Sequence, residues 1–208
     1  MKSKIKIAVL IEQHYDHDEW IAFTNFFRVE CKTEIIPVSH LWGQTKLTFY
    51  ANGNDNTIPG ACDVTEEINN LKASDFAGIL IIGGYASDRL RYEERPSKDG
   101  DCQSPAARFI ASALVNPSIV VATLCHGLWL LTAMPSLIKG RSVTCAPNIV
   151  RDVQNAGANI VFDGLELKKI VADDNLITAS HPEVLSDFMK LVWTTIQEKQ
   201  TKQEIKGA

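Results

Sequence analysis

The chain alternates short apolar runs with longer amphipathic stretches, and this alternation restricts its fold more than any other feature. Residues 78–82 and 118–124 are nearly continuous apolar runs bounded by glycine or proline, as expected of strands covered on both faces. Residues 18–30 instead carry apolar side chains at helical spacing. Strand and helix patterns in alternation predict an α/β protein, with a mostly parallel central sheet and helices on both faces.

The same patterns predict the remaining elements. Further strands are expected at residues 4–11, 33–38 and 176–179, and helices at residues 104–116, 127–134, 147–156 and 182 to about 197. Residues 159–162 and 167–171 flank Asp163-Gly164, which is a hairpin signal. In such a sheet, ligands bind beyond the carboxyl ends of the strands, here after residues 11, 82 and 124.

We expect a single domain over residues 1–208 with three additions. Residues 41–61 are polar and turn-rich, and Asn52-Gly53 between residues 48–50 and 57–58 indicates an inserted hairpin. Residues 92–103 are charged and contain Pro96 and Gly100, which favours a loop. The polar tail at about residues 198–208 is expected to fray.

Charge and cysteine content exclude several classes of protein. The chain has 208 residues and a formal net charge of −4, which gives no electrostatic footprint for nucleic acid or an anionic membrane. Its five cysteines are odd in number and lack CxxC pairing, which argues against a disulfide framework or a zinc site. The first apolar run, residues 7–11, is too short for a signal peptide. We expect a reduced, cytoplasmic protein that binds neither nucleic acid nor membranes.

The strongest chemical signal is Cys125-His126-Gly127, which follows an apolar strand and precedes a helix. A sharp strand-to-helix turn presents a nucleophile at the edge of the sheet, and a helix N-terminus favours the thiolate. His126 is suited to orient the thiolate or to move protons. The alternative is a buried structural cysteine with a neighbouring histidine by chance.

Two other strand ends carry groups that suit the same site. Gly83-Gly84 directly follows a buried strand, and the N–H groups of Gly84 and His126 are candidates for an oxyanion hole. An ordinary tight turn is the alternative there. Residues 12–20 are dense in titratable groups, so an acid after the first strand is a candidate for general acid–base work. Metal binding by this segment is not favoured, because its spacing matches no metal motif, and we expect no metal or other cofactor.

These motifs together resemble the ThiJ/PfpI superfamily, and most closely its PfpI-type branch. The resemblance rests on residues 6–20, on residues 63–65 through 83–88, and on Leu124-Cys125-His126-Gly127. It continues through later segments at residues 140–147, 155–164 and 177–180. It implies a flavodoxin-like sandwich of the kind found in class I glutamine amidotransferases.

The resemblance also implies roles for individual residues. Cys125 would be the nucleophile and His126 its partner, while the family's glutamate at the elbow falls on Asp16. In the PfpI-type branch, an acid after the glycine turn reaches the histidine of a neighbouring subunit, and that position is Asp88. Gly83 and Tyr85 would bind substrate, with Tyr85 standing where the branch often has arginine. A homodimer or larger homo-oligomer is therefore implied.

Four functions remain open on these observations. The first is a cysteine-dependent glyoxalase or deglycase acting on reactive carbonyls or on glycated protein. The others are an intracellular peptidase, a redox sensor or stress chaperone, and a glutamine amidotransferase. Ser180-His181-Pro182-Glu183 resembles the His-Pro-Glu of amidotransferases, but it also fits a helix start with Ser180 as the N-cap, and we favour the helix start. Cys145 follows a predicted strand, and we expect it to approach the site.

Overall fold

A computed structural model describes residues 4–52, 60–96 and 98–207 of the chain. Its centre is a seven-stranded sheet with the strand order β12-β13-β7-β6-β1-β2-β5. All neighbouring strands are parallel except β12, which runs antiparallel to β13. This confirms the expected mostly parallel sheet. The strands are β1 (Lys6–Leu10), β2 (Glu34–Ser39), β5 (Glu66–Glu67), β6 (Gly78–Ile81), β7 (Val120–Leu124), β12 (Ile170–Asp173) and β13 (Leu176–Ala179).

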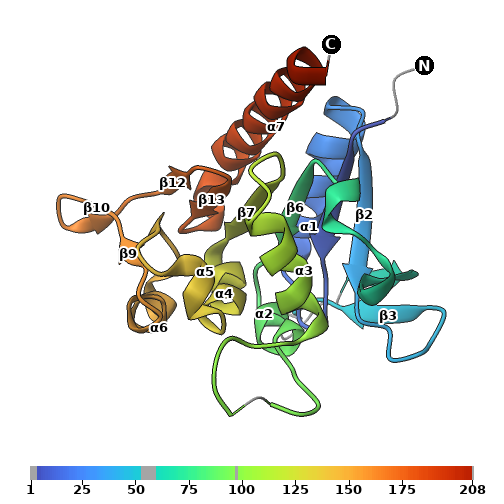
Figure 1. Cartoon of the computed structure of the whole chain (residues 1–208), viewed down its shortest axis with the longest axis horizontal. Helices are drawn as coiled ribbons and strands as arrows, with labels where there is room; N and C mark the ends of the chain where they lie inside the picture. Colours follow the sequence, from blue (N-terminus) through green and yellow to red (C-terminus); the bar gives the residue numbers. More distant parts are fainter. Residues whose placement is uncertain (1–3, 53–59, 97, 208) are drawn as a thin grey trace.

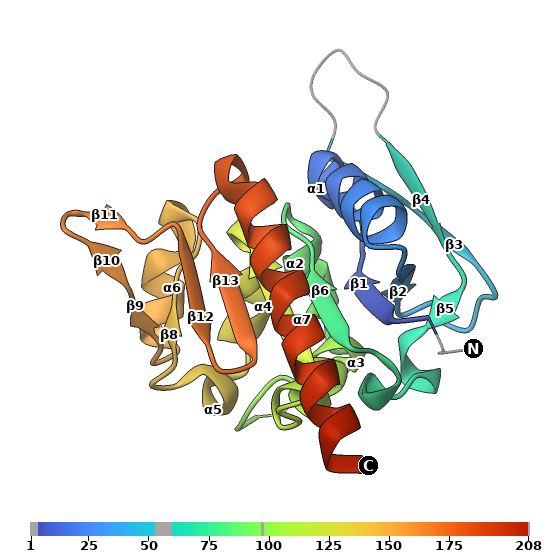
Figure 2. The ribbon, with the colours of Figure 1, turned by 90° about the horizontal axis from the view of Figure 1, so that it is seen from above.

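Helices cover both faces of the sheet (Figures 1 and 2). One face carries α1 (His17–Phe23), which continues as a π-helix over Thr24–Glu30, and α7 (Leu185–Gly207). The other face carries α2 (Ala86–Leu90), α3 (Pro105–Leu114) and α4 (Trp129–Thr132), while α5 (Pro135–Ile138) and α6 (Val150–Asn155) follow towards the β12 edge. Among the described residues, no helix has both the length and the apolar character that crossing a bilayer demands.

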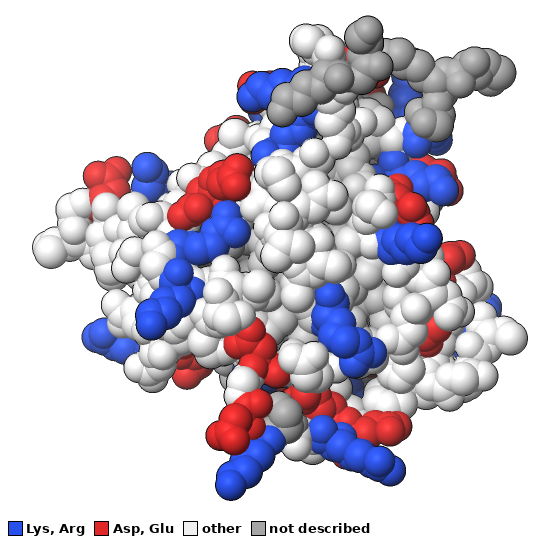
Figure 3. Space-filling model, in the orientation of Figure 1, with Lys and Arg blue, Asp and Glu red and all other residues white. Residues whose placement is uncertain are grey.

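Charges of both signs are mixed on the face of the molecule that Figure 3 shows. Lysine and arginine side chains alternate there with aspartate and glutamate side chains, and white areas of uncharged residues lie between them. This face therefore carries no broad patch of positive charge of the kind that attracts nucleic acid.

The register of the three central strands brings the expected site together. Val9 pairs with Leu80, and Leu80 pairs with Ala122, so β1, β6 and β7 end at the same edge of the sheet. All residues of β6 and β7 are buried, because helices cover both faces of these strands. The loops that follow these strands therefore meet over one edge, as parallel topology requires.

The two short hairpins lie outside the central sheet. β3 (Leu47–Tyr50) pairs with β4 (Ala61–Val64), so the expected hairpin exists, with β4 as the partner strand. The expected turn at Gly53 and the run 57–58 lie outside the described residues. The second hairpin forms around Gly164, from β10 (Phe162–Asp163) and β11 (Glu166–Leu167). The expected strand 167–171 is divided between β11 and β12, and β8 (Ser142–Val143) pairs with β9 (Asn159–Ile160).

The expectation of a fraying tail is wrong. Helix α7 continues to Gly207 instead of ending near Gln197. Lys199 helps to hold this extension, because its Nζ donates to the carbonyl oxygen of Pro117 at 2.7 Å and lies 3.8 Å from the Asp174 carboxylate. The Lys199 ammonium group thus joins helix α7 to the loop before β7 and to the turn between β12 and β13.

Candidate active site

Cys125 stands at a strained turn between β7 and a 3-10 helix (Cys125–Leu128) that leads into α4. Its φ of 54° lies in the left-handed region, which costs a non-glycine residue about 1–3 kcal/mol. Gly127 makes the turn possible, because a Cβ there would lie 2.3 Å from Thr123 Oγ1 and 2.6 Å from the Ile81 carbonyl oxygen. This geometry is that of a nucleophile elbow.

His126 contacts the sulfur directly. Its Nδ1 lies 3.1 Å from Cys125 Sγ, and its Nε2 lies 2.8 Å from Asn148 Nδ2. Burial lowers the pKa of His126, which keeps the ring neutral at neutral pH, while the Asn148 contact acts in the opposite direction. With the Asn148 amide donating to Nε2, the ring proton sits on Nδ1 and is donated to the sulfur. No sequence motif pointed to Asn148, because only the fold brings the turn before α6 to the elbow.

The acid at the centre of the site is Glu19, which sequence reasoning missed. Its side chain is fully buried, and Oε2 accepts the backbone N–H of Gly83 at 2.7 Å. Oε1 has no hydrogen-bond partner among the described residues. Burial, followed by the nearby charge of Asp16, raises the pKa of Glu19 well above its usual range. The raised pKa favours the protonated carboxyl group, and the charge of Glu19 acts in turn on Cys125.

Asp16, the expected acid, has a different task. It is the N-cap of α1, and its Oδ1 accepts the backbone N–H of Glu19 at 3.0 Å. Glu19 lies one turn further along, and helical side chains lean back towards the N-terminus, so its carboxyl group turns towards the sheet. Among the described residues, no hydrogen bond joins Asp16 to the sulfur, although its charge still raises the pKa of Cys125.

The thiol is harder to ionise than the motif alone predicts. Burial, with the charge of Glu19 behind it, raises the pKa of Cys125 to about 11, although a hydrogen bond involving His126 lowers it. The 3-10 helix and α4 are each four residues long, so the dipole expected at this position is small. Cys125 and Glu19 are thus coupled, and together they hold one negative charge more easily than two.

The remaining predicted residues surround this pair. Gly84 has a φ of 76°, and a Cβ there would lie 2.5 Å from the His14 carbonyl oxygen, so the turn requires glycine. The Tyr85 ring is exposed, and its centroid lies 6.0 Å from that of His126. Asp88 points to solvent and forms a 3.7 Å ion pair with Arg91 of its own chain.

The segment that resembles an amidotransferase motif is a helix start. His181, rather than the expected Ser180, is the capping residue, and its Nδ1 accepts the backbone N–H of Glu183 at 3.3 Å. Ser180 donates instead to the carbonyl oxygen of Lys169. Among the described residues, His181 makes no hydrogen bond or ion pair with Cys125.

The other cysteines are free thiols, and one of them is a neighbour of the elbow. Cys145 is fully buried, and Ala146 N–H donates to the Cys125 carbonyl oxygen at 3.2 Å. Burial, followed by the charge of Cys125, raises the pKa of Cys145 to about 12. Cys145 therefore stays a thiol at neutral pH, packed next to the strand that carries the nucleophile.

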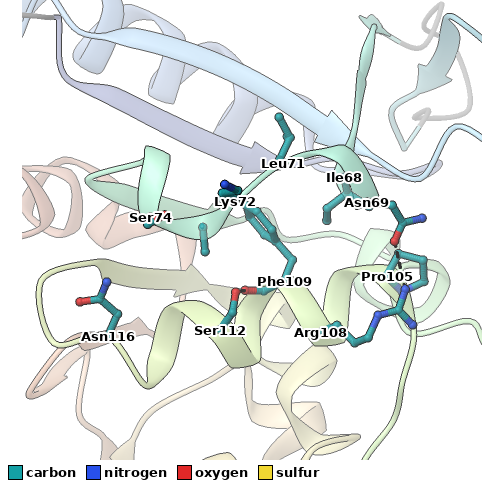
Figure 4. A pocket seen from close by; sticks show the side chains of 11 residues that line it. Ile68, Asn69, Leu71, Lys72, Ser74, Pro105, Arg108, Phe109, Ser112 and Asn116 are labelled. Atoms are coloured by element: carbon teal, nitrogen blue, oxygen red, sulfur yellow. Dashed lines mark hydrogen bonds between the residues drawn. The ribbon is translucent and has the colours of Figure 1, made fainter.

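The described surface carries several larger cavities. Figure 4 shows a groove of about 450 Å³ between α3 and the segment that contains Asn69 and Lys72. Arg108 reaches across one end of this groove, where it donates to Asn69 Oδ1 at 3.0 Å. Cys125 lines none of five cavities on the described surface.

The chain belongs to the DJ-1/PfpI family, whose model matches residues 5–195. It is similar to uncharacterised proteins of Staphylococcus haemolyticus, at 31% identity over 64% of this chain and 69% of the relative, and of Staphylococcus saprophyticus, at 33% over 62% and 64%. The chain thus spans about two thirds of the length of these relatives.

Solved structures confirm the fold. A two-domain protein from Anabaena variabilis, with DJ-1/ThiJ/PfpI-like and ferritin-like domains, aligns with a TM-score of 0.75 and 25% identity, over 93% of this chain and 48% of its own. A ThiJ/PfpI domain protein from Brachyspira murdochii aligns with a TM-score of 0.72 and 17% identity, over 94% of this chain and 99% of its own.

Proposed function

We propose that the protein is a cysteine-dependent enzyme that converts small reactive carbonyl compounds, such as methylglyoxal or its early adducts. The observation that carries the proposal is the 3.1 Å contact of Cys125 with His126, at a strained elbow next to the buried Glu19, whose pKa burial raises. A thiolate, a hydrogen-bond donor and a carboxylic acid on one side of an exposed sheet edge are the groups that carbonyl addition needs.

In this mechanism, the reactive form of the site is the one in which Cys125 and Glu19 together hold one proton. When Glu19 holds it, the Cys125 thiolate attacks the aldehyde carbon, and the new oxyanion takes its proton from Glu19, leaving a hemithioacetal. The Glu19 carboxylate then removes the proton from that carbon and returns it to the neighbouring carbonyl carbon, while the hydroxyl proton moves to the neighbouring oxygen, and a 2-hydroxy thioester results. Water releases the hydroxyacid and restores the thiol. Because the Gly83 N–H already donates to Glu19, the backbone N–H groups of Gly84 and His126 are the proposed donors to the oxyanion.

Replacing Cys125 with alanine is the direct test. We expect loss of methylglyoxal conversion by about a thousandfold or more, because the covalent step disappears. The measurement is lactate formation by the purified full-length chain, with each enantiomer assayed separately. Cys102→Ala, a second partly buried cysteine outside the site, is the matched control and should retain activity. Absence of turnover by the unmodified protein would refute the carbonyl hypothesis.

Two of the three alternatives have less support. A peptidase needs room for a chain on both sides of the scissile bond, whereas a small carbonyl compound needs only the elbow itself. A redox sensor needs the Cys125 thiolate just as the proposed enzyme does, so the raised pKa does not separate the two; selective peroxide oxidation of Cys125 without carbonyl turnover would favour the sensor. Glutaminase activity needs a histidine partner at His181, whose side chain is exposed and caps a helix.

We also propose that two copies of the chain assemble around the elbow, with Asp88 of one copy approaching His126 of the other. In support, the Asp88 side chain is 57% exposed and holds only a 3.7 Å pair with Arg91. Asp88→Asn should lower turnover by about tenfold in the dimer, with a shift in the pH profile from loss of the charge next to His126. Light scattering gives the assembly state. A monomer, or an unchanged pH profile in the variant, would contradict this arrangement.

A further inference from the structure

Two segments that lie outside the main strand and helix pattern meet in space, although about fifty residues separate them in sequence. Trp42 comes from the segment before β3, and Tyr92 comes from the loop after α2. Their ring centroids lie 5.7 Å apart, and the His40 ring lies 4.3 Å from that of Trp42. Trp42 has a φ of 54°, in the left-handed region that non-glycine residues rarely adopt.

The aromatic pair borders a cavity of about 540 Å³. Small-molecule sites usually have volumes of about 300–1,000 Å³. The cavity lies at the carboxyl end of β1, where ligands bind in parallel sheets. Trp42 is 44% exposed and Tyr92 is 57% exposed, so both rings present apolar faces that nothing in the described chain covers completely. The lining also includes Glu12, Leu47, Phe49, Asp88 and Arg89.

The polar groups in this cavity favour a cation. Glu12 is 8% exposed, and burial raises the pKa of its carboxyl group. Its Oε1 accepts the backbone N–H of Gln13 at 2.7 Å, but its charged partner, Arg89, is a long 3.7 Å away and more than half exposed. Asp88 adds a second carboxylate to the lining, but it pairs at 3.7 Å with Arg91, which lies outside the lining, so Glu12 is the buried acid of this cavity. An additional positive charge would compensate Glu12 better than Arg89 does.

We propose that this cavity is a second binding site, for an organic cation that carries a guanidinium group on an apolar stem. The planar cation would pair with the Glu12 carboxylate, and the faces of Trp42 and Tyr92 would hold it by cation–π contact. Leu47 and Phe49 would pack against the stem. The groove of Figure 4 offers a contrast, because Lys72 and Arg108 line it without any acidic residue, and it repels such a ligand.

The site goes beyond the carbonyl chemistry at Cys125, which is not among the residues that line this cavity. A free amine such as agmatine and an arginine side chain within a peptide would present the same guanidinium group. The two sources differ in the chemical group at the other end of the stem, and titrations with both probes separate them. The neutral comparison is a peptide with citrulline in place of arginine, which keeps the shape and removes the charge.

Calorimetric titration of the full chain with agmatine and with the peptide Gly-Arg-Gly tests the proposal. We expect saturable binding of at least one of them with a Kd below about 1 mM, and none of the citrulline peptide. Glu12→Gln and Tyr92→Leu should each weaken binding about tenfold or more. Tyr50→Leu removes a similarly exposed tyrosine outside the cavity and should leave binding unchanged. Cys125→Ala should also bind normally, which separates this site from the proposed catalysis.

Three results would overturn the proposal. These are no saturation by either cation, equal binding of the citrulline peptide, and unchanged affinity in both Glu12→Gln and Tyr92→Leu. Circular dichroism of the variants accompanies the titration, because a loss of affinity counts only in a folded protein. Should Glu12→Gln fail to fold, Tyr92→Leu still decides the question, since its side chain is 57% exposed.

Discussion

Glu19→Gln is expected to lower carbonyl turnover by about a hundredfold to ten-thousandfold, the usual contribution of a general acid. Glutamine has the same shape, and its carbonyl oxygen can still accept the Gly83 N–H that Glu19 Oε2 accepts at 2.7 Å. It cannot give up or accept the proton that Cys125 and Glu19 share. The measurement is kcat for lactate formation, with Asp16→Asn as the companion variant.

Glu19→Gln is also expected to increase the free energy of unfolding, because it removes a buried carboxyl group whose ionisation the folded chain disfavours. The pKa of Glu19 is raised in the folded chain, so above the usual carboxyl pKa the unfolded chain has lost a proton that the folded chain retains. The contribution of Glu19 to the free energy of unfolding therefore falls as the pH rises from the usual carboxyl pKa to the raised pKa of Glu19. The fall is at most about 1.4 kcal/mol per pH unit. Glu19→Gln should be the more stable protein at about pH 8, and the advantage should shrink towards about pH 4.

Denaturant unfolding across this pH range measures the effect, and Glu183→Gln, which removes a carboxylate with 75% side-chain exposure, is the matched control. A Glu19→Gln protein that keeps full activity, together with an inactive Asp16→Asn protein, would return the acid role to Asp16. Equal stability of the Glu19→Gln and parent proteins at every pH would show that the pKa of Glu19 is not raised in the folded state.

Gly127→Ala is expected to destabilise the fold by about 3 kcal/mol or more. The new Cβ would lie 2.3 Å from Thr123 Oγ1 and 2.6 Å from the Ile81 carbonyl oxygen, so the backbone of β6 and β7 must separate. Turnover should fall as well, because the elbow would move away from Glu19. Thermal and denaturant unfolding measure the loss.

Gly100→Ala is a suitable control for that experiment. Gly100 has a φ of 93°, and a Cβ added there would meet nothing within 4 Å, so its substitution carries only the backbone penalty, about 1 kcal/mol. A Gly127→Ala protein no less stable than Gly100→Ala would contradict the close packing at the elbow.

The sequence predicted those parts of the site that depend on neighbouring residues in the chain. An apolar strand followed by Cys125-His126-Gly127 specifies an elbow locally, and Gly83-Gly84 specifies a close turn. Local motifs could not identify the acid that lies next to Cys125, because residues 16–19 contain several acidic candidates. Which of them turns towards the sheet depends on where α1 begins, and the cap formed by Asp16 decides this.

Long-range contacts account for the other differences. Asn148 reaches His126 only after α6 and the turn before it have packed against the elbow. The extension of α7 depends on Lys199, whose contacts with Pro117 and Asp174 span a large separation in the chain. Polar composition alone predicted a frayed end, since it carries no information about these two acceptors.

The loops that follow β1 and β6 are joined by three hydrogen bonds besides any side-chain packing. Asp16 N–H donates to the Gly83 carbonyl oxygen at 3.2 Å, Tyr85 N–H donates to the His14 carbonyl oxygen at 2.9 Å, and Gly83 N–H donates to Glu19. Glu19 and the Gly83-Gly84 turn therefore hold each other in position. A displacement of either loop therefore displaces the other. We expect residues in the two loops to co-vary among relatives, and a loop transferred alone from one relative to another to disturb the site.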